Sequence, residues 1–320
     1  MIRILDRSAT EKLISYDDAI AVTRSMFARF DSGEAVIFPV TRGHGSTQGT
    51  RFGLKAGFDR TLRQPGLKVG SYWPGNAAKG LPNHGSTTLL LDDETGFPIA
   101  LVESTWLNAL RTSASDAVAV DLLARKDASV LAVIGTGHQA YHEAHAVARV
   151  RPLADVIIAG RDPEKAARLA ERLRADGLPA RCAEIGNAVG VADIVVTVTA
   201  ARGALFSSQM VRPGTHISAM GADGPGKQEL PADLAYHALL FADAVEQSTT
   251  IGEFQMLAGT PAADTITPIG AVINGRRPGR SRADGITLYD SSGIALQDIT
   301  IAALALERAQ AAGLGVQVAF

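Results

Sequence analysis

A short apolar run followed by a glycine-containing turn and a helix constrains the fold of this chain more than any other feature. Residues 130–134 (VLAVI) precede residues 135–140 (GTGHQA), which have the pattern G-x-G-x-x-A. In such a turn the first glycine permits a tight bend, the second lets a pyrophosphate approach the backbone, and the small third residue allows close helix–strand packing. A glycine-rich turn of another α/β domain would share the pattern, but the flanking strand and helix favour dinucleotide binding.

The sequence after this turn alternates apolar runs with helical segments. Further runs that we interpret as strands occupy residues 156–159, 194–199, 216–220 and 238–241. An Ala-rich helix is predicted over residues 163–176. This alternation is typical of a parallel sheet covered by helices. We therefore predict an α/β fold with a Rossmann-type dinucleotide-binding domain over residues 114–298.

The first third of the chain predicts a different, α+β architecture. Apolar residues at near-helical spacing indicate an early helix over residues 17–31. Strands are expected at residues 36–40, 51–58, 66–72 and 86–91, and the turn residues 92–96 predict a hairpin between residues 87–91 and 98–103. A helix over residues 106–125 would link the two halves, and one over residues 299–312 would pack back on the first. The second domain is thus predicted from residues 1–113 plus 299–320.

Composition excludes several classes of protein. The net charge is −2, and no run of Lys and Arg is dense enough for a nucleic-acid patch. No apolar stretch approaches the roughly 20 residues that span a bilayer, and the N-terminal residues lack the pattern of a signal peptide. The single cysteine, Cys182, rules out an internal disulfide framework. We expect a cytoplasmic protein without a nucleic-acid or membrane partner.

The end of the second predicted strand bears on cofactor choice. An NAD-preferring site usually places Asp or Glu about 20 residues past the glycines, where it binds the ribose 2′-hydroxyl. Gly160 holds that place here and Arg161 follows it. Because arginine pairs with phosphates, this tilts the interpretation toward NADP. Asp162 reaching the ribose, or Arg161 stacking on adenine, would instead fit an NAD enzyme.

Three histidines on the helix after the glycine turn have the spacing of a metal site. His138 and His142 form an H-x-x-x-H pair, with His145 one turn further on. However, Gln139 stands where a metalloprotease would use Glu, and His138 lies within the phosphate-binding turn. We therefore predict surface or cofactor-contacting histidines and no metal.

At this point the sequence resembles the ornithine cyclodeaminase/μ-crystallin family over nearly its whole length. The segments that carry the resemblance are Phe38–Arg42, Gly66–Lys68, Leu107–Thr112, Gly135–Gln139, Met220–Asp223 and Leu288–Gly293. Within the family, residues 68–74, 83–84 and 226–230 look like the iminosuccinate reductase branch.

The resemblance implies a homodimer in which residues 1–113 and the C-terminal helix form the dimerisation and substrate domain. It also implies that Arg42, Lys68 and Arg111 surround the substrate α-carboxylate and that Asp223 faces the reacting carbon and nitrogen. Arginine forks bind carboxylates, a lysine beside an imine can hold or donate its proton, and a carboxylate stabilises an iminium.

Each of these four residues also has a structural alternative. Arg42 or Arg111 would serve in an ion pair, Lys68 on a solvated strand and Asp223 in a turn. The expected dinucleotide contacts are Thr112, Gly135, Thr136, Gly137, His138, Gln139, Arg161, Thr199, Met220 and Ser292.

One departure from the family concerns the substrate side chain. In the cyclodeaminases a carboxylate thirteen residues before the active-site lysine receives the distal amine, and the resemblance places Lys55 there. Reversing a charge at about 4 Å changes the interaction by several kcal/mol in a partly buried site. Lys55 therefore favours a second carboxylate, as in iminosuccinate or aspartate. An exposed lysine on a strand edge is the alternative.

The resulting hypothesis is an NAD(P)-dependent imino-acid reductase, or in reverse an amino-acid dehydrogenase, that moves a hydride to or from the α-carbon. Two alternatives stay open. One is a cyclodeaminase-type lyase that uses bound NAD as an internal shuttle, and the other is a non-catalytic binding protein like the crystallin members of the family.

Overall fold

The computed structural model describes residues 1–319 and divides the chain into two compact units. Unit 1 comprises Met1–Arg111 with the C-terminal segment from Ile294, and unit 2 is Thr112–Gly293. The first division falls inside helix α3 (Thr105–Leu123) and the second just before helix α9 (Ala295–Ala311).

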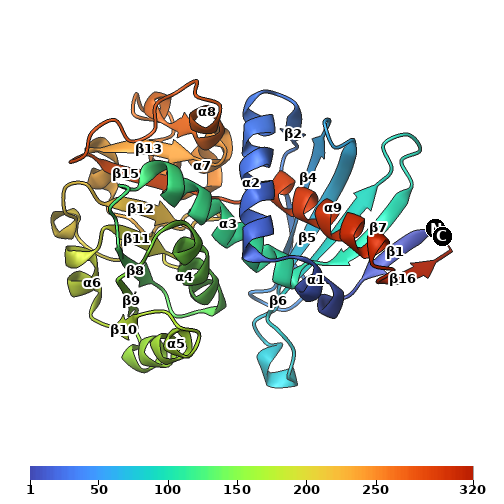
Figure 1. Ribbon diagram of the computed structural model, residues 1–320, viewed down its shortest axis with the longest axis horizontal. Helices are drawn as coiled ribbons and strands as arrows, with labels where there is room; N and C mark the ends of the chain where they lie inside the picture. Colours follow the sequence, from blue (N-terminus) through green and yellow to red (C-terminus); the bar gives the residue numbers. More distant parts are fainter. Residues whose placement is uncertain (320) are drawn as a thin grey trace. The chain divides into compact units, whose positions relative to one another are not determined.

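Unit 2 is built on an eight-stranded parallel sheet with strand order β10-β9-β8-β11-β12-β15-β13-β14 (Figure 1). Its strands are β8 (Val130–Ile134), β9 (Asp155–Ala159), β10 (Ala180–Cys182), β11 (Ile194–Thr197), β12 (His216–Ala219), β13 (Ala238–Ala242), β14 (Thr267–Pro268) and β15 (Ile286–Asp290). The first six strands of the order are those of a doubly wound dinucleotide-binding sheet, in which the order reverses beside the first strand. This confirms the predicted Rossmann-type domain.

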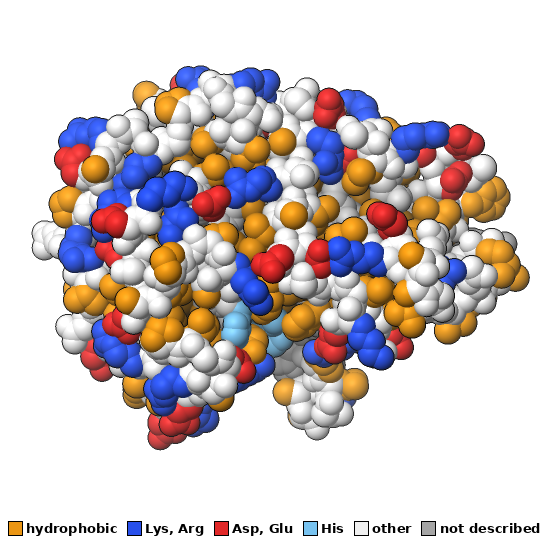
Figure 2. Space-filling model, in the orientation of Figure 1, with side chains coloured by type: hydrophobic (Ala, Val, Ile, Leu, Met, Phe, Trp, Pro, Cys, Tyr) orange, Lys and Arg blue, Asp and Glu red, His pale blue; other side chains and the backbone are white. Residues whose placement is uncertain are grey.

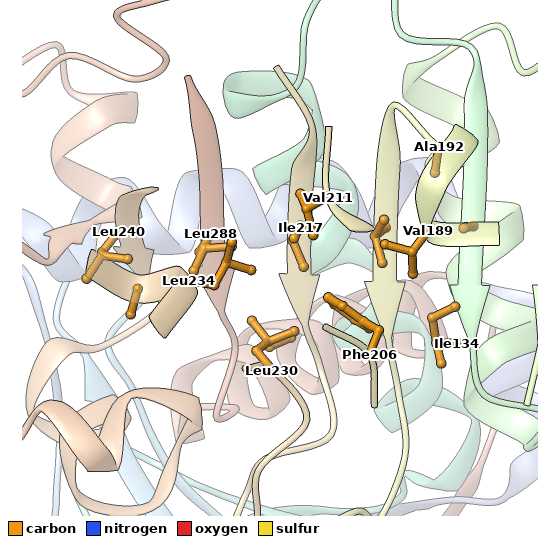
Figure 3. Close-up of a cluster of buried hydrophobic side chains, with 14 of the residues drawn as sticks. Ile134, Val189, Ala192, Phe206, Val211, Ile217, Leu230, Leu234, Leu240 and Leu288 are labelled. Carbon is orange, nitrogen blue, oxygen red and sulfur yellow. The ribbon is translucent and has the colours of Figure 1, made fainter. Parts of the chain in front are cut away.

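Helices connect and flank these strands. They are α4 (His138–Val150), α5 (Pro163–Ala175), α6 (Ile185–Val191), α7 (Val245–Ile251) and α8 (Ile269–Ile273), with short 3-10 helices η2 (Ser208–Met210), η3 (Ala232–Tyr236), η4 (Glu253–Leu257) and η5 (Ala263–Thr265). Parallel strands buried on both faces carry near-continuous apolar runs. Figure 3 shows the result, with Ile134, Ile217 and Leu288 on strands and Val189 and Leu234 among the residues packed against them.

The expected strand ends need correction. The runs predicted over residues 194–199 and 216–220 end as strands at Thr197 and Ala219. Thr199 and Met220 therefore lie in the connections beyond the carboxyl ends of β11 and β12. A strand at Ile286–Asp290 was not predicted, because Thr287 and Asp290 leave only a short apolar run.

Unit 1 is an eight-stranded sheet of order β16-β1-β7-β6-β5-β4-β2, with β3 paired to β4. Its strands are β1 (Ile2–Leu5), β2 (Ala35–Ile37), β3 (Thr41–Gly43), β4 (Arg51–Asp59), β5 (Gln64–Tyr72), β6 (His84–Leu91), β7 (Pro98–Glu103) and β16 (Val316–Val318), and its other helices are α1 (Arg7–Leu13), α2 (Tyr16–Asp31) and η1 (Ala77–Lys79). The predicted helix and hairpin are confirmed. The predicted α+β architecture with one early helix was incomplete, because an unpredicted strand β1 pairs with β7 in parallel and α1 precedes α2.

Helix α9 covers one face of this sheet over β4, β5 and β6 (Figure 1). Two glycines allow its close approach: a Cβ at Gly57 would lie 3.3 Å from Leu296 Cδ2, and one at Gly66 would lie 3.3 Å from Ile299 Cγ1. The helix begins at Ala295, not at the predicted residue 299, because the Gln297 side chain accepts the Ile294 N–H at 2.9 Å and supports an earlier start. Asp298 thereby lies within the helix.

None of the helices within residues 1–319 combines the length and the apolar character that crossing a bilayer requires. On the face drawn in Figure 2, Lys and Arg side chains are interspersed with Asp and Glu side chains.

Candidate active site

A buried charged cluster lies in unit 1 where α9 crosses the sheet. Lys68 on β5 and Arg111 on α3 both contact Asp298 Oδ1, at 3.0 Å from Nζ and 3.1 Å from Nε. Both cations also donate to the Asn108 side-chain oxygen. Lys68, Arg111 and Asp298 are only 5%, 8% and 2% exposed, so the cluster is an internal site and not a surface ion pair.

Strand register places the other predicted substrate residues on the same sheet face as Lys68. Lys55 on β4 is the direct partner of Lys68, and Arg42 on β3 is the partner of Gly53 two residues from Lys55. Side chains of directly paired residues share a face, as do residues two apart on one strand. Arg42, Lys55 and Lys68 therefore project from one face of the sheet.

Glycines leave open space on the sheet surface between the side chains of Arg42, Lys55 and Lys68. Gly53 pairs with Gly70, which pairs with Ser86. Among the described atoms outside the neighbouring residues, a Cβ built on Gly70 would meet only Lys68 Cε, at 3.7 Å, and one on Gly53 only Thr41 O, at 3.6 Å. A small ligand thus has room beside the charged side chains.

Burial dominates the proton affinity of this cluster. It lowers the pKa of the Lys68 ammonium to about 7; the Asp298 carboxylate opposes this shift, and Arg111 and Lys55 reinforce it. Burial tends to raise the pKa of Asp298, but Arg111, Lys68 and Lys55 outweigh it and hold that pKa below its ordinary value. Lys68 can consequently gain or lose a proton near neutral pH, beside a carboxylate that remains ionised.

The cluster also has unfilled hydrogen-bonding capacity. Within residues 1–319, Asp298 Oδ2, Gln297 Nε2 and Ser86 Oγ are buried without a partner. The Arg111 guanidinium, which has five N–H donors, makes three hydrogen bonds: Nε to Asp298, Nη1 to Gln297 and Nη2 to Asn108. One N–H on each terminal nitrogen is left, and these groups can donate to the oxygens of a carboxylate.

The glycine turn of unit 2 is suited to a dinucleotide phosphate. Gly135 has φ of 152°, and a Cβ there would lie 2.7 Å from Val198 O, so only glycine fits. Gly137 caps α4, and a Cβ on it would meet no described atom within 4 Å, which leaves its outer side open. Helix α4 begins at His138, so the N–H groups of Thr136, His138 and Gln139 lie at or beside a helix N-terminus, where anions bind.

Arg161 and Asp162, which follow β9, differ in whether their side chains are already hydrogen-bonded. Asp162 caps α5 by accepting the N–H groups of Glu164 and Lys165, both at 3.1 Å. Arg161 is exposed and makes no hydrogen bond or ion pair within the described residues. A Cβ at Gly160 would lie 2.8 Å from Thr136 Cγ2, so an acidic residue there would require Thr136 to move.

The remaining predicted contacts lie in loops or on α3. Thr199 follows β11, and its N–H and hydroxyl donate to Glu229 Oε1 at 2.6 and 2.8 Å. Asp223 follows β12 and pairs with Lys227 at 2.5 Å. Ser292 follows β15, where it donates to Asp243 and accepts from Gln247. Thr112 is on α3, and Met220 is buried directly after β12.

The three histidines do not behave as one group. Of the two expectations for these histidines, surface or cofactor-contacting, the first does not hold for His142, which is buried; burial lowers the pKa of its imidazole to about 3. His142 lies 3.3 Å from His138, nitrogen to nitrogen, and His145 pairs with Asp176. Within residues 1–319, no group of three or more His, Cys, Asp or Glu side chains has the arrangement of a metal site.

Sequence reasoning missed Asp298, Asn108 and Glu229. Asp298 was assigned to the other domain because the C-terminal helix was expected to start at residue 299, four residues after its observed start at Ala295. Asn108 and Glu229 lie within segments that carry the family resemblance, so that resemblance was the available signal for them.

The sheet order and the open glycine turn define a protein with a Rossmann-type dinucleotide-binding domain and a separate α+β unit that contains the buried Lys68–Arg111–Asp298 cluster. The model of the ornithine cyclodeaminase/mu-crystallin family matches residues 2–313, and the chain belongs to that family.

Relatives in the family are enzymes of amino-acid and imino-acid chemistry. The chain is 38% identical over 308 residues to iminosuccinate reductase of Paracoccus denitrificans, covering 96% of each chain. The crystal structure of that reductase with NAD+ superposes with a TM-score of 0.94 at 36% identity, covering 100% of this chain and 99% of the other. An archaeal alanine dehydrogenase dimer with bound NAD has a TM-score of 0.94 at 32% identity, with the same coverage.

Proposed function

We propose that this protein is a nicotinamide-dinucleotide-dependent imino-acid reductase, which in reverse acts as an amino-acid dehydrogenase. The observation that carries the proposal is the buried Lys68–Arg111–Asp298 cluster, whose lysine titrates near neutrality and whose arginine has N–H donors left for a carboxylate. Such a cluster suits a substrate with an α-carboxylate next to a nitrogen that changes protonation. The named relatives, a reductase and a dehydrogenase, support the same reaction class.

The dinucleotide would be held by unit 2. Its phosphates would bind the N–H groups of Thr136, Gly137, His138 and Gln139 above Gly135, with further contacts from Thr112, Thr199, Met220 and Ser292. When bound, the cofactor supplies or accepts the hydride. The relatives' structures contain NAD+ or NAD, and the exposed, unpartnered Arg161 supports acceptance of NADP as well.

The substrate α-carboxylate would be bound by Arg111, through one N–H from each terminal nitrogen, and by Arg42. Lys68 would hold the proton at Nζ and donate it to the substrate nitrogen, since its pKa of about 7 allows proton exchange at neutral pH. Asp298 would keep Lys68 in place. Asp223 would stabilise the positive charge of the iminium, which accepts a hydride more readily than the neutral imine.

We further propose a dicarboxylic substrate, such as iminosuccinate. Lys55 is the cross-strand partner of Lys68 and stands on the open, glycine-floored face of the sheet. A second carboxylate on the substrate would pair with its ammonium, whereas the ornithinium side chain of a cyclodeaminase substrate would be repelled.

A second copy of the chain is proposed to cover the sheet face of unit 1 that points away from α9. Ile4, Phe52, Leu101 and Val316 lie on that face and are 36–65% exposed. The relative crystallised as a dimer supports this assembly. Leu101→Asp is expected to convert a dimer into a monomer in light scattering after gel filtration; a wild-type monomer would overturn the assembly.

The function is tested by a substrate screen. The protein is assayed with NADH and with NADPH against oxaloacetate plus ammonia, and against pyruvate plus methylamine, while absorbance at 340 nm is followed. We expect consumption with the dicarboxylic imine, retention in Lys12→Met, which changes an exposed lysine of unit 1, and loss in Lys68→Met. Flat absorbance across the imines would overturn the proposal, and ammonia release from ornithine without net cofactor change would assign a cyclodeaminase.

A further inference from the structure

Glu229 is a fully buried carboxylate to which both connections beyond β11 and β12 are attached. Its Oε1 accepts the Thr199 N–H at 2.6 Å and the Thr199 hydroxyl at 2.8 Å. Its Oε2 accepts the Gly221 N–H at 2.8 Å and the Thr197 hydroxyl at 2.9 Å. One side chain thus joins the ends of two neighbouring parallel strands.

The side chain of Glu253 holds the backbone at Glu229 and Leu230. The N–H of Glu229 itself donates to both Glu253 carboxylate oxygens at 3.0 Å, and the N–H of Leu230 donates to Glu253 Oε1 at 2.7 Å. Glu229 and Glu253 are 0% and 2% exposed. There is also no space for a side chain at Gly221, where a Cβ would lie 2.2 Å from Thr199 O and 2.6 Å from Glu229 Oε1. The two connections therefore have a single close-packed arrangement.

The location of Glu229 indicates what it positions. In a sheet of this strand order the dinucleotide crosses the carboxyl ends of the strands where the order reverses, beside β8. The glycine turn after β8 and Arg161 after β9 lie on the adenosine side. The connections after β11 and β12 lie on the other side, which takes the nicotinamide half, and Asp223 is only two residues from Gly221.

We propose that Glu229 is a positioning residue that shapes the nicotinamide half of the cofactor site by holding Thr199 and Gly221 in register. The inference rests on the proposed dinucleotide-dependent function and adds a residue to it. Glu229 touches no substrate or cofactor in this role; it acts through the backbone of the two connections.

The hydrogen-bond pattern explains why glutamate is required. Each carboxylate oxygen accepts one backbone N–H, from Thr199 on one side and from Gly221 on the other. A glutamine has one oxygen and one NH2 group, so in either orientation its NH2 faces a backbone N–H and leaves it unpaired. Glu229→Gln therefore preserves size while it must release one of the two connections.

Selective ligand binding tests the proposal. Dissociation constants of NADH and of ADP, which lacks the nicotinamide, are measured by calorimetry for wild type and Glu229→Gln. We expect NADH to bind about 10- to 100-fold more weakly while ADP changes less than about 2-fold, since the unpaired N–H lies on the nicotinamide side. Glu246→Gln, an exposed glutamate of the same unit, is the matched control and should bind both ligands as the wild type does.

A milder variant keeps the test valid if Glu229→Gln does not fold. Thr197→Val keeps the shape of a buried side chain but removes the hydroxyl that donates to Glu229. This variant should weaken NADH binding about 2- to 10-fold and leave ADP binding unchanged. Unchanged NADH affinity, or equal losses for NADH and ADP, would overturn the positioning role and leave the proposed function intact. Wild-type protein that binds neither ligand would overturn the proposed function itself.

Discussion

Two of the buried charged regions of this protein, one around Glu229 and one around Lys68, differ in how completely their polar atoms are paired. Around Glu229 in unit 2, each carboxylate oxygen accepts two hydrogen bonds. Around Lys68 in unit 1, Asp298 Oδ2 and Gln297 Nε2 have no partner within the described residues. Both regions are buried, so burial alone does not separate them.

This difference in pairing distinguishes a region that fixes the backbone from one with hydrogen-bonding capacity left for a ligand. A fully paired buried carboxylate fixes the segments it bonds, whereas unpaired buried polar atoms cost free energy unless something else satisfies them. A substrate with a carboxylate and a nitrogen would supply those partners in unit 1. Charge removal is therefore expected to affect chemistry in unit 1 and cofactor geometry in unit 2.

The largest expected effect is that of Lys68→Met on turnover. Loss of a proton donor at the reacting nitrogen typically lowers kcat about 10²- to 10⁴-fold. Arg111 still pairs with Asp298 in this variant, so the buried carboxylate keeps a counter-charge and the protein should still fold. Steady-state assays measure kcat, and calorimetry of the same preparation measures thermal stability. A substantial residual kcat would show that Lys68 does not take part in the chemistry and would contradict the proposed difference between the two regions.

Charge reversal at Lys55 should follow in size. Lys55→Glu is expected to lower kcat/KM for a dicarboxylic imine about 100-fold, because an attractive charge becomes repulsive in a partly buried site. A monocarboxylic imine should lose much less. Equal losses for both substrates would show that Lys55 does not contact the second carboxylate.

The pH profile sharpens the role of Asp298. Asp298→Asn removes the carboxylate that opposes the effect of burial on Lys68, so the pKa of Lys68 should fall further below about 7. If protonated Lys68 is the proton donor, the alkaline limb of kcat/KM for imine reduction should move to lower pH. An unmoved limb in an otherwise active variant would contradict the pairing.

A smaller effect is expected for Arg161, which is proposed to contact the cofactor at the surface of unit 2. Arg161→Ala should reduce the ratio of kcat/KM with NADPH to that with NADH about tenfold, the usual scale for one charge-assisted hydrogen bond to phosphate. Arg168→Ala on α5, an exposed arginine paired with Glu164, serves as the control. A ratio that stays constant in Arg161→Ala would argue for an NAD-type site.

Stability should respond to pH in opposite directions in the two regions. The pKa of Lys68 is lowered from 10.5 to about 7, so the unfolded chain binds more protons between these values and its contribution to stability rises with pH there. Burial raises the pKa of Glu253 from 4.5 to about 8, so the folded protein binds more protons and stability falls as pH rises through that range. Denaturant unfolding of Lys68→Met and Glu253→Gln across pH should flatten one slope each; an unchanged slope would refute the corresponding shift.

Much of the fold was predictable because its signals are local. The glycine turn and the apolar runs of β8, β9 and β13 identified the parallel sheet, and the spacing before Asp31 identified α2. The parallel pairing of β1 with β7 and the antiparallel pairing of β1 with β16 join distant parts of the chain, and no local pattern encodes them.

The site was predictable only in part for the same reason. Lys55 and Lys68 share a face of the sheet because they are cross-strand partners. The alternation of side chains along each strand suggests this arrangement from the sequence. Asp298, however, reaches Lys68 from a helix more than two hundred residues further along the chain. The early start of α9, which places Asp298 among its polar neighbours, depends on Gln297 accepting the Ile294 N–H. The periodicity of the sequence does not predict this contact.

The late position of α9 in the chain has a consequence for biosynthesis. Ribosomes release the segment Thr112–Gly293 as one uninterrupted stretch, so its parallel sheet has every strand available before the last helix emerges. By contrast, β4 to β6 must remain uncovered on the Gly57–Gly66 side until residues 295–311 have been translated. The side of this sheet that carries Gly57, Gly66 and Lys68 is therefore uncovered while residues 112–293 are being translated.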